Sequence, residues 1–203
     1  MMKRYLGLLL VIILVSSCIN ETQKFKLNTL DLEKLQFDFK SESFFAENAM
    51  NKQYFIGKYE YTIKGGQKGY EYIHDRSSSA DKLAKFYSLN FDKIGALTTL
   101  SDELMLFYAY TKNADSLVYR GLIEKLTEKY GIPVHNPNPQ NIWPDGIRMT
   151  WSNKNKVIQI YPRTVYSHFH QENRFWITLF IANPKYEKKL RGSLNTGNWN
   201  CFD

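Results

Sequence analysis

Alternation of apolar and polar residues with a period of two most constrains how this chain can fold. From Leu30 onward aromatic residues, which make up 15% of the 203-residue chain, recur at alternate positions. The clearest series lies on both sides of a glycine-rich segment and comprises Tyr59, Tyr61, Ile63, Tyr70 and Tyr72. Since successive side chains of a strand point to opposite faces of a sheet, this series predicts a β-hairpin whose turn contains Gly65, Gly66 and Gly69.

Other short segments predict strands by the same criterion: 35–39, 104–110, 147–151, 157–161 and 175–182. Residues 104–110 are apolar throughout, which is typical of a strand covered on both faces. In residues 157–161 both alternating sets contain apolar side chains, so the pattern leaves open which face is buried. Residues 82–90 fit a strand or a short helix, and we favour a strand.

One helix is expected at about residues 113–130. Its apolar stripe recurs at a spacing of four and consists of Val118, Leu122, Leu126 and Tyr130. Asn113 or Asp115 can cap its start. Its end is marked by Gly131-Ile132-Pro133, in which the glycine can end the helix, the isoleucine can make the accompanying apolar contact, and the proline prevents continuation.

These elements predict an α+β fold: an antiparallel sheet of about six or seven strands, with the helix at about 113–130 packed on one face. The alternative is two small subdomains divided near residues 75–79. Between Glu103 and Ala182, a strand, a helix ending in Lys-Tyr-Gly-Ile-Pro, a loop with tryptophan and a hairpin follow one another. This order resembles uncharacterised bacterial envelope proteins. The resemblance implies an α+β domain and carries no activity with it.

The first eighteen residues have the character of an export signal. Lys3 and Arg4 give a positive start, and the unbroken apolar run 6–15 is about half of the ~20 residues that span a bilayer. The ending Val15-Ser16-Ser17-Cys18 resembles the lipobox of bacterial lipoproteins. This resemblance implies cleavage before Cys18 and attachment of diacylglycerol, and usually an N-acyl chain, to that cysteine. The alternatives are an ordinary secretory signal that contains a cysteine and an uncleaved N-terminal anchor.

The expected organisation is a signal peptide at 1–17, a flexible tether at 18–28 and a single domain at 29–203. Loss of the 17 signal residues leaves 186, which is long enough to bury a core. Two or more acyl chains on Cys18 would give stable membrane attachment. Because Ile19 follows the cysteine, where aspartate favours retention in the inner membrane, we expect the outer membrane rather than the inner.

Composition favours some classes of partner over others. The formal net charge falls from +7 to +5 when Lys3 and Arg4 are removed, and the remaining lysines are scattered among acidic residues. We therefore expect no nucleic-acid partner. If Cys18 is acylated, Cys201 has no partner for an internal disulfide. No catalytic residues and no cofactor are assigned, because serine, histidine and acidic residues occur without the motifs that would bring them together.

The only candidate metal ligands are weak ones. His168, His170 and Glu172 occupy alternate positions, so on a strand they would point to the same side and could contribute to a zinc site. The alternative is that all three lie in a turn and face water. No metal site is expected.

Aromatic residues in segments rich in turn-forming residues are the candidates for contact with a partner. They are Trp143, Tyr166 and Trp199, together with Ile142 beside Trp143. Tyrosine and tryptophan are enriched where binding energy concentrates, because they offer a large rigid surface with a polar tip. The alternative for Trp143 is that it covers the helix end or a sheet edge.

The sequence therefore favours a membrane-anchored, non-enzymatic binding or accessory protein with a protein or glycan partner in the envelope. An immunity-type protein that neutralises a toxin is one form of this hypothesis. The alternative is an envelope hydrolase that acts on cell-wall or glycan material. A hydrolase would bring histidine or carboxylate groups together in a pocket.

Overall fold

The computed structural model describes residues 30–48, 55–63, 65–75, 82–137, 147–191 and 202. The strands are β1 (Leu30–Asp31), β2 (Phe55–Thr62), β3 (Lys68–Asp75), β4 (Ala84–Phe86), β5 (Leu89–Phe91), β6 (Lys93–Thr99), β7 (Leu104–Thr111), β8 (Val134–Pro137), β9 (Ile147–Ser152), β10 (Val157–Ser167) and β11 (Glu172–Ala182). The helical segments are η2 (Leu32–Lys34), α2 (Ser41–Asn48), α3 (Ser116–Tyr130) and α4 (Glu187–Arg191). Within these ranges, no helix is long and apolar enough to cross a membrane.

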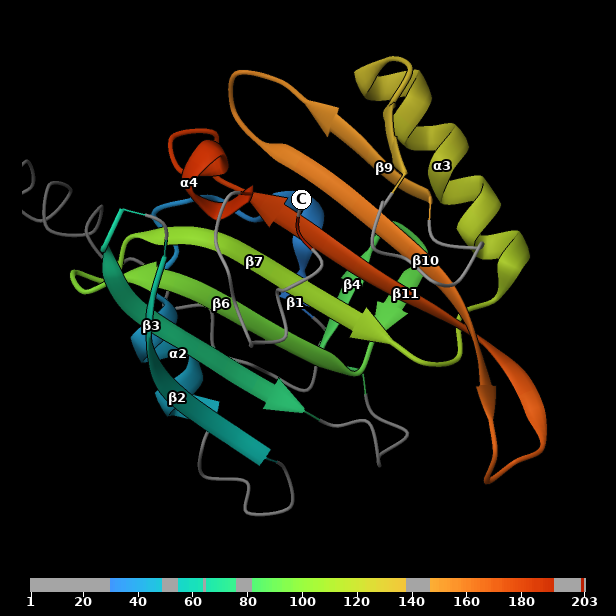
Figure 1. Ribbon diagram of the computed structural model, residues 1–203, viewed down its shortest axis with the longest axis horizontal. Helices are drawn as coiled ribbons and strands as arrows, with labels where there is room; N and C mark the ends of the chain where they lie inside the picture. Colours follow the sequence, from blue (N-terminus) through green and yellow to red (C-terminus); the bar gives the residue numbers. More distant parts are fainter. Residues whose placement is uncertain are drawn as a thin grey trace, which may run out of the picture.

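The fold is dominated by one antiparallel sheet of eight strands in the order β2-β3-β6-β7-β11-β10-β9-β8. Figure 1 shows it as a twisted layer that runs the length of the molecule. A second sheet has the order β1-β4-β5, with β1 parallel to β4. The expected antiparallel sheet is thus present, but the estimate of six or seven strands in one sheet is too low. β3 pairs directly with β6, so the strands on both sides of residues 75–79 belong to the same sheet.

The central strands carry apolar side chains on both of their faces. In β7 every residue is buried except Tyr110, which is partly buried. Ile177, Leu179 and Ile181 of β11 join one apolar cluster, whereas Phe180 and Ala182 join another. The first cluster lies on what we call the inner face of the sheet, and the second lies on the outer face. A sheet that is apolar on both faces must be covered on both.

The inner face is covered by the small sheet, α2 and α3 (Figure 1). The predicted apolar stripe of α3 buries Leu122 and Leu126 there. Trp151 of β9 is 2% exposed, and its indole Nε1 donates a 3.0 Å hydrogen bond to the carbonyl oxygen of Gly131. That bond satisfies a carbonyl at the end of the helix and fixes α3 against the sheet.

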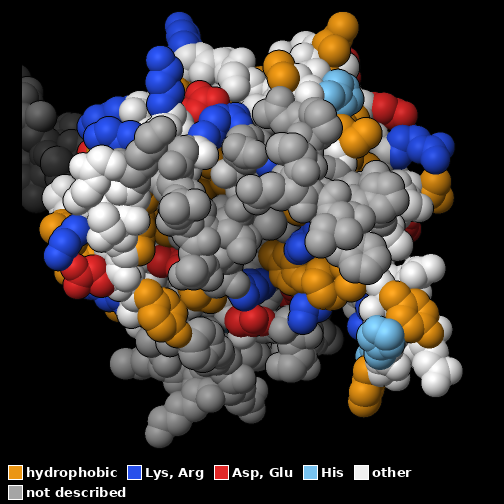
Figure 2. Space-filling view, viewed as in Figure 1, with side chains coloured by type: hydrophobic (Ala, Val, Ile, Leu, Met, Phe, Trp, Pro, Cys, Tyr) orange, Lys and Arg blue, Asp and Glu red, His pale blue; other side chains and the backbone are white. Residues whose placement is uncertain are grey.

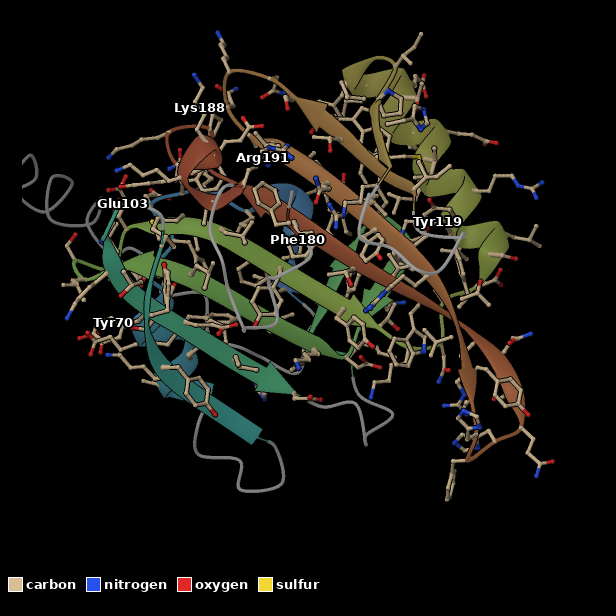
Figure 3. All side chains as sticks on the ribbon, in the orientation of Figure 1. Tyr70, Glu103, Tyr119, Phe180, Lys188 and Arg191 are labelled. Atoms are coloured by element: carbon tan, nitrogen blue, oxygen red, sulfur yellow. The ribbon has the colours of Figure 1, made fainter. Side chains whose placement is uncertain are left out.

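The outer face is covered in part by α4 and by Phe202. The ring of Phe202 lies 5.7 Å from that of Phe180. At the start of β7, the Glu103 carboxylate accepts a 2.6 Å hydrogen bond from the Tyr186 hydroxyl and also pairs with Lys185 (Figure 3). The hydroxyl and the ammonium group lower the pKa of Glu103. The described residues of the two clusters extend from Leu30 to Phe202.

The predicted helix is confirmed as α3, with a start three residues later than expected. The Asp115 side chain caps it by accepting a 2.7 Å hydrogen bond from the amide of Leu117. Gly131 follows with φ 86° and its amide bonds to the Thr127 carbonyl. The apolar contact predicted for Ile132 is wrong, because this side chain is 88% exposed. The expectation of a single long helix is wrong, because the described residues contain α2, α4 and the short η2 as well as α3.

The strand predicted at 35–39 is wrong. This segment follows η2 and leads into α2, and its aromatic side chains pack on the inner face instead of alternating across a sheet. The start of α2 is capped by a residue that is far away in the sequence. The Asp102 carboxylate accepts hydrogen bonds of 3.1 and 3.3 Å from the amide of Glu42. Burial of the Asp102 carboxyl raises its pKa despite these bonds.

Three other expectations are confirmed. β2 and β3 form the predicted hairpin, and Gly65 and Gly66 of its turn adopt φ of 85° and 77°, which glycine tolerates best. Gly69 was wrongly assigned to the turn, because it lies in β3 opposite Tyr61. Residues 82–90 form strands, although these belong to the small sheet. The two predicted strands 157–161 and 175–182 pair as β10 and β11, and both faces of residues 157–161 are buried.

The surroundings of two glycines predict opposite effects of substitution by alanine. A Cβ atom at Gly95 would overlap the ring of Tyr108, whereas a Cβ at Gly121 of α3 meets nothing within 4 Å. Gly95→Ala should lower the free energy of unfolding by about 1–3 kcal/mol through overpacking. Gly121→Ala should raise it by about 0.5–1 kcal/mol, because alanine favours the helix. Urea unfolding followed by circular dichroism measures both, and equal effects would contradict the described packing.

Candidate functional site

Strands β10 and β11 continue beyond the strands on either side of them. β10 pairs with β9 only at residues 157–160, and β11 pairs with β7 only at residues 177–182. The two strands remain paired with each other as far as Ser167 and Glu172. Residues 161–176 thus form a hairpin arm, which projects from the sheet at the lower right of Figure 1.

A series of aromatic and cationic side chains lies at the base of the arm, on the outer face of the sheet. We call it the Arg–aromatic row; its members are Arg148 of β9, Tyr161 and Arg163 of β10, Trp176 of β11, Tyr110 of β7 and the adjoining Lys112. The pairing of the strands produces this arrangement. Arg163 lies directly opposite Trp176, and Thr178, two residues along, lies opposite Tyr110.

Rings and cations alternate along the row. The guanidinium carbon of Arg148 lies 5.1 Å from the centre of the Tyr161 ring, and that of Arg163 lies 5.2 Å from the same ring. Arg163 also lies 5.6 Å from the centre of the Trp176 ring. The ammonium nitrogen of Lys112 lies 5.6 Å from that ring centre as well. These separations are within the range of cation–π attraction.

Trp176 is the centre of this arrangement, because it contacts two cations and a second ring. Its ring meets that of Tyr110 edge to face, with centres 5.5 Å apart and planes at 85°. This geometry is favoured by the quadrupoles of aromatic rings. Figure 2 shows hydrophobic and basic side chains side by side on this face, right of centre.

Within the row, the Nε atom of Arg163 and the Nε1 atom of Trp176 are buried and have no acceptor among the described residues. Buried donors are nearly always paired, since an unpaired one costs about 1–3 kcal/mol. This pair of donors therefore calls for an oxygen acceptor from outside the described residues.

The polar groups beside the row are paired within the fold. Buried Gln159 donates a 3.1 Å hydrogen bond to the hydroxyl of Thr150. The Tyr108 hydroxyl donates a 2.8 Å bond to the Glu71 carboxylate. Further along the sheet, Tyr61 donates to the Thr98 carbonyl, and burial raises the pKa of the Tyr61 hydroxyl. Buried polar atoms without a hydrogen-bond partner also occur away from the row, among them the hydroxyls of Thr98 and Tyr119, but at the base of the arm two such donors belong to residues that lie opposite each other.

Of the residues predicted to contact a partner, the structure describes only Tyr166. Its side chain is 49% exposed, and its position in β10 places it on the opposite face of the arm from Arg163. Phe169, in the turn of the arm, is 91% exposed. Ile142, Trp143 and Trp199 lie outside the described residues, as does the predicted lipidation site Cys18.

The weak metal candidates are not brought together. His168 and His170 are exposed in the turn after β10, not on a strand, and their rings contact Tyr166 and Phe169 respectively. Glu172 begins β11 and pairs with Arg174 at 2.8 Å. Among the described residues, no group of three histidine, cysteine, aspartate or glutamate side chains could hold a metal ion.

Sequence reasoning missed the row because its members are distributed over four strands. A signal was nevertheless present, since Tyr161, Arg163 and Val165 continue the alternation of residues 157–161. The predicted strands ended at residue 161 and began again at residue 175, and those boundaries hid the arm.

No protein-family model matches the chain, and it has no significant similarity to a curated protein or to a solved structure.

The unpaired Arg163 donor predicts that this side chain adds little to stability. Arg163→Met keeps the apolar part of the side chain. The loss of the cation–π contacts should destabilise the fold, and the loss of the buried unpaired donor should stabilise it. We expect the free energy of unfolding to change by less than about 1 kcal/mol. The matched control Trp151→Phe removes the hydrogen bond to Gly131 and should cost about 1–3 kcal/mol. Chemical unfolding measures both; a larger loss in Arg163→Met than in Trp151→Phe would assign Arg163 to the core.

Proposed function

We propose that this chain is a non-enzymatic binding protein of the bacterial envelope, anchored to a membrane by a lipid on Cys18. Its binding surface is the Arg–aromatic row, and its partner is a glycan or a protein of the envelope. The observation that carries this proposal is the pair of buried donors, Arg163 Nε and Trp176 Nε1, which have no acceptor among the described residues.

The geometry of the row suits binding. Its side chains project from four neighbouring antiparallel strands, so their spacing is set by the sheet. Aromatic and arginine side chains dominate the energetics of binding surfaces. A rigid surface loses little conformational entropy when a ligand arrives. A donor that costs stability in the free protein can recover that cost in the complex, as sites of function often do.

The anchor follows from the first eighteen residues. The apolar run, the small serines and Cys18 have the order of a lipoprotein signal, and Ile19 favours the outer membrane. The domain would then lie next to the membrane surface at the end of a tether of about ten residues, 18–28. Such a chain reaches at most about 40 Å.

The binding surface is tested by capture from envelope extract. The mature chain 18–203, with Cys18→Ser, would be immobilised and compared with its Trp176→Ala and Tyr166→Ala variants. We expect the Trp176 variant to lose the captured material, while the Tyr166 variant, altered on the other face of the arm, retains it. Protease and glycosidase treatment of the extract identifies the class of partner. Equal capture by all three proteins would exclude the row as the binding surface.

The anchor is tested separately in cells. Cys18→Ser in the full chain should abolish labelling by a radioactive or clickable fatty acid, because the thioether to diacylglycerol cannot form. The variant should also leave the membrane fraction or remain uncleaved. Cys201→Ser is the matched control and should be labelled like the wild type. Labelling of the Cys18 variant would overturn the lipoprotein assignment.

A further inference from the structure

We infer that the ligand of the Arg–aromatic row is a saccharide that carries a carboxylate group. This inference rests on the proposed binding function and specifies its ligand. The structure assigns the carboxylate to Arg163 and Trp176 Nε1, and the sugar ring to the aromatic surface of Trp176 and Tyr110. Three features of the row lead to this chemistry: its charge, its unpaired donors and its rings.

The charge of the row favours an anion. Neither Arg163 nor Lys112 forms an ion pair with a carboxylate among the described residues. Other cations of the same face do: Arg174 pairs with Glu172 at 2.8 Å, and Lys93 pairs with Asp75 at 3.7 Å. The charge of Lys112 also acts on the carboxyl of Asp92: burial raises the pKa of this carboxyl, and Lys112 opposes that shift. Arg163 is therefore the cation next to Trp176 that keeps its charge available for a ligand. Complementary charge both attracts and orients a ligand.

The two unpaired donors favour an acceptor with two oxygens. Arg163 and Trp176 face each other across β10 and β11, and each contributes one buried N–H without an acceptor among the described residues. A carboxylate is planar, accepts hydrogen bonds on both oxygens and donates none. Charge-assisted bonds of this kind to arginine are among the strongest in proteins. One carboxylate could thus satisfy both donors once the side chains of Arg163 and Trp176 turn to expose them, since both atoms are buried in the free protein.

The rings and the backbone favour a saccharide over an acidic peptide. Aromatic rings pack against the apolar C–H face of a pyranose, and Trp176 and Tyr110 offer such rings beside the cations. Peptides are commonly bound by pairing with the free backbone of a strand edge. The row instead lies on a sheet face, where Arg163 and Trp176 belong to strands whose backbones pair with each other. Only side chains are available there, and they match the ring and acid group of a uronic acid.

The test measures binding of defined oligosaccharides by nuclear magnetic resonance. The protein is the mature chain 18–203 with Cys18→Ser, which contains the whole described core. The probes are a galacturonic acid tetramer, its carboxyl-reduced neutral counterpart and a sulfated tetramer. The readout is the indole N–H signal of Trp176. It is distinguished from the signals of the other three tryptophans because it alone disappears in Trp176→Phe.

We expect the galacturonate tetramer to shift the Trp176 signal and to bind at least tenfold more tightly than the neutral and sulfated tetramers. Arg163→Gln should weaken binding roughly tenfold to a hundredfold, since a charge-assisted bond is lost. Arg174→Gln is the matched control, because Arg174 is already paired, and it should stay within about twofold of the wild type. If Arg163→Gln fails to fold, Lys112→Gln replaces it, and loss of this single half-buried charge should weaken binding about threefold to tenfold.

The outcomes separate this inference from the proposed function. Equal binding of the neutral or the sulfated tetramer would overturn the carboxylate assignment and leave the row as a glycan-binding surface. If no tetramer binds while capture from envelope extract still depends on Trp176, the saccharide inference is wrong and the binding function stands. If capture also fails to depend on Trp176, both are wrong.

Discussion

The need to bury both faces of the central strands governs the rest of this structure. β7 is apolar from Leu104 to Tyr110, so a single covering layer would leave half of these side chains in water. The inner face is covered by the small sheet with α2 and α3, and the outer face by α4 and Phe202. Each large side chain that is fully buried contributes about 1.5–3 kcal/mol, so both layers are needed to hold the sheet.

The candidate site lies where the sheet extends past this double cover. β10 and β11 extend beyond the residues that pair with β9 and β7. At the start of this extension, the side chains on their outer face change from apolar to aromatic and cationic. Phe180 lies in the covered part of β11. Trp176 lies four residues earlier on the same face of this strand, between Arg163 and Lys112. The core fixes the strands, and the strands fix the spacing of the row. A ligand would therefore meet strands that are already arranged, and only the side chains of Arg163 and Trp176 would have to turn to expose their donors.

The parts of the fold that sequence predicted correctly depend on local signals. The hairpin of β2 and β3 has its glycines in the turn, and α3 has its own cap at Asp115 and its own stop at Gly131. The parts that sequence missed depend on distant residues. α2 begins where Asp102, sixty residues away, accepts a hydrogen bond from Glu42. No pattern within residues 35–48 contains that information.

The site was less predictable than the fold for the same reason. Trp176 looked like one more apolar residue of a strand, and its two cationic neighbours, Arg163 and Lys112, come from two other segments. Tyr166 was identified as exposed, which holds, but strand alternation puts it on the other face from the row. Composition can identify aromatic residues outside the core. Only strand register decides which of them share a surface.

Hydrogen–deuterium exchange along β10 tests the central claim most directly, because one strand passes from the doubly covered sheet into the arm. Amides at 157–160 should exchange only on global unfolding, whereas those at 163–167 should exchange by local opening and much faster. Addition of galacturonate tetramer should slow exchange near Arg163 and leave the turn at 168–171 unchanged. Uniform exchange along β10, or protection confined to the turn, would contradict a rigid sheet that presents its ligand surface at the base of the arm.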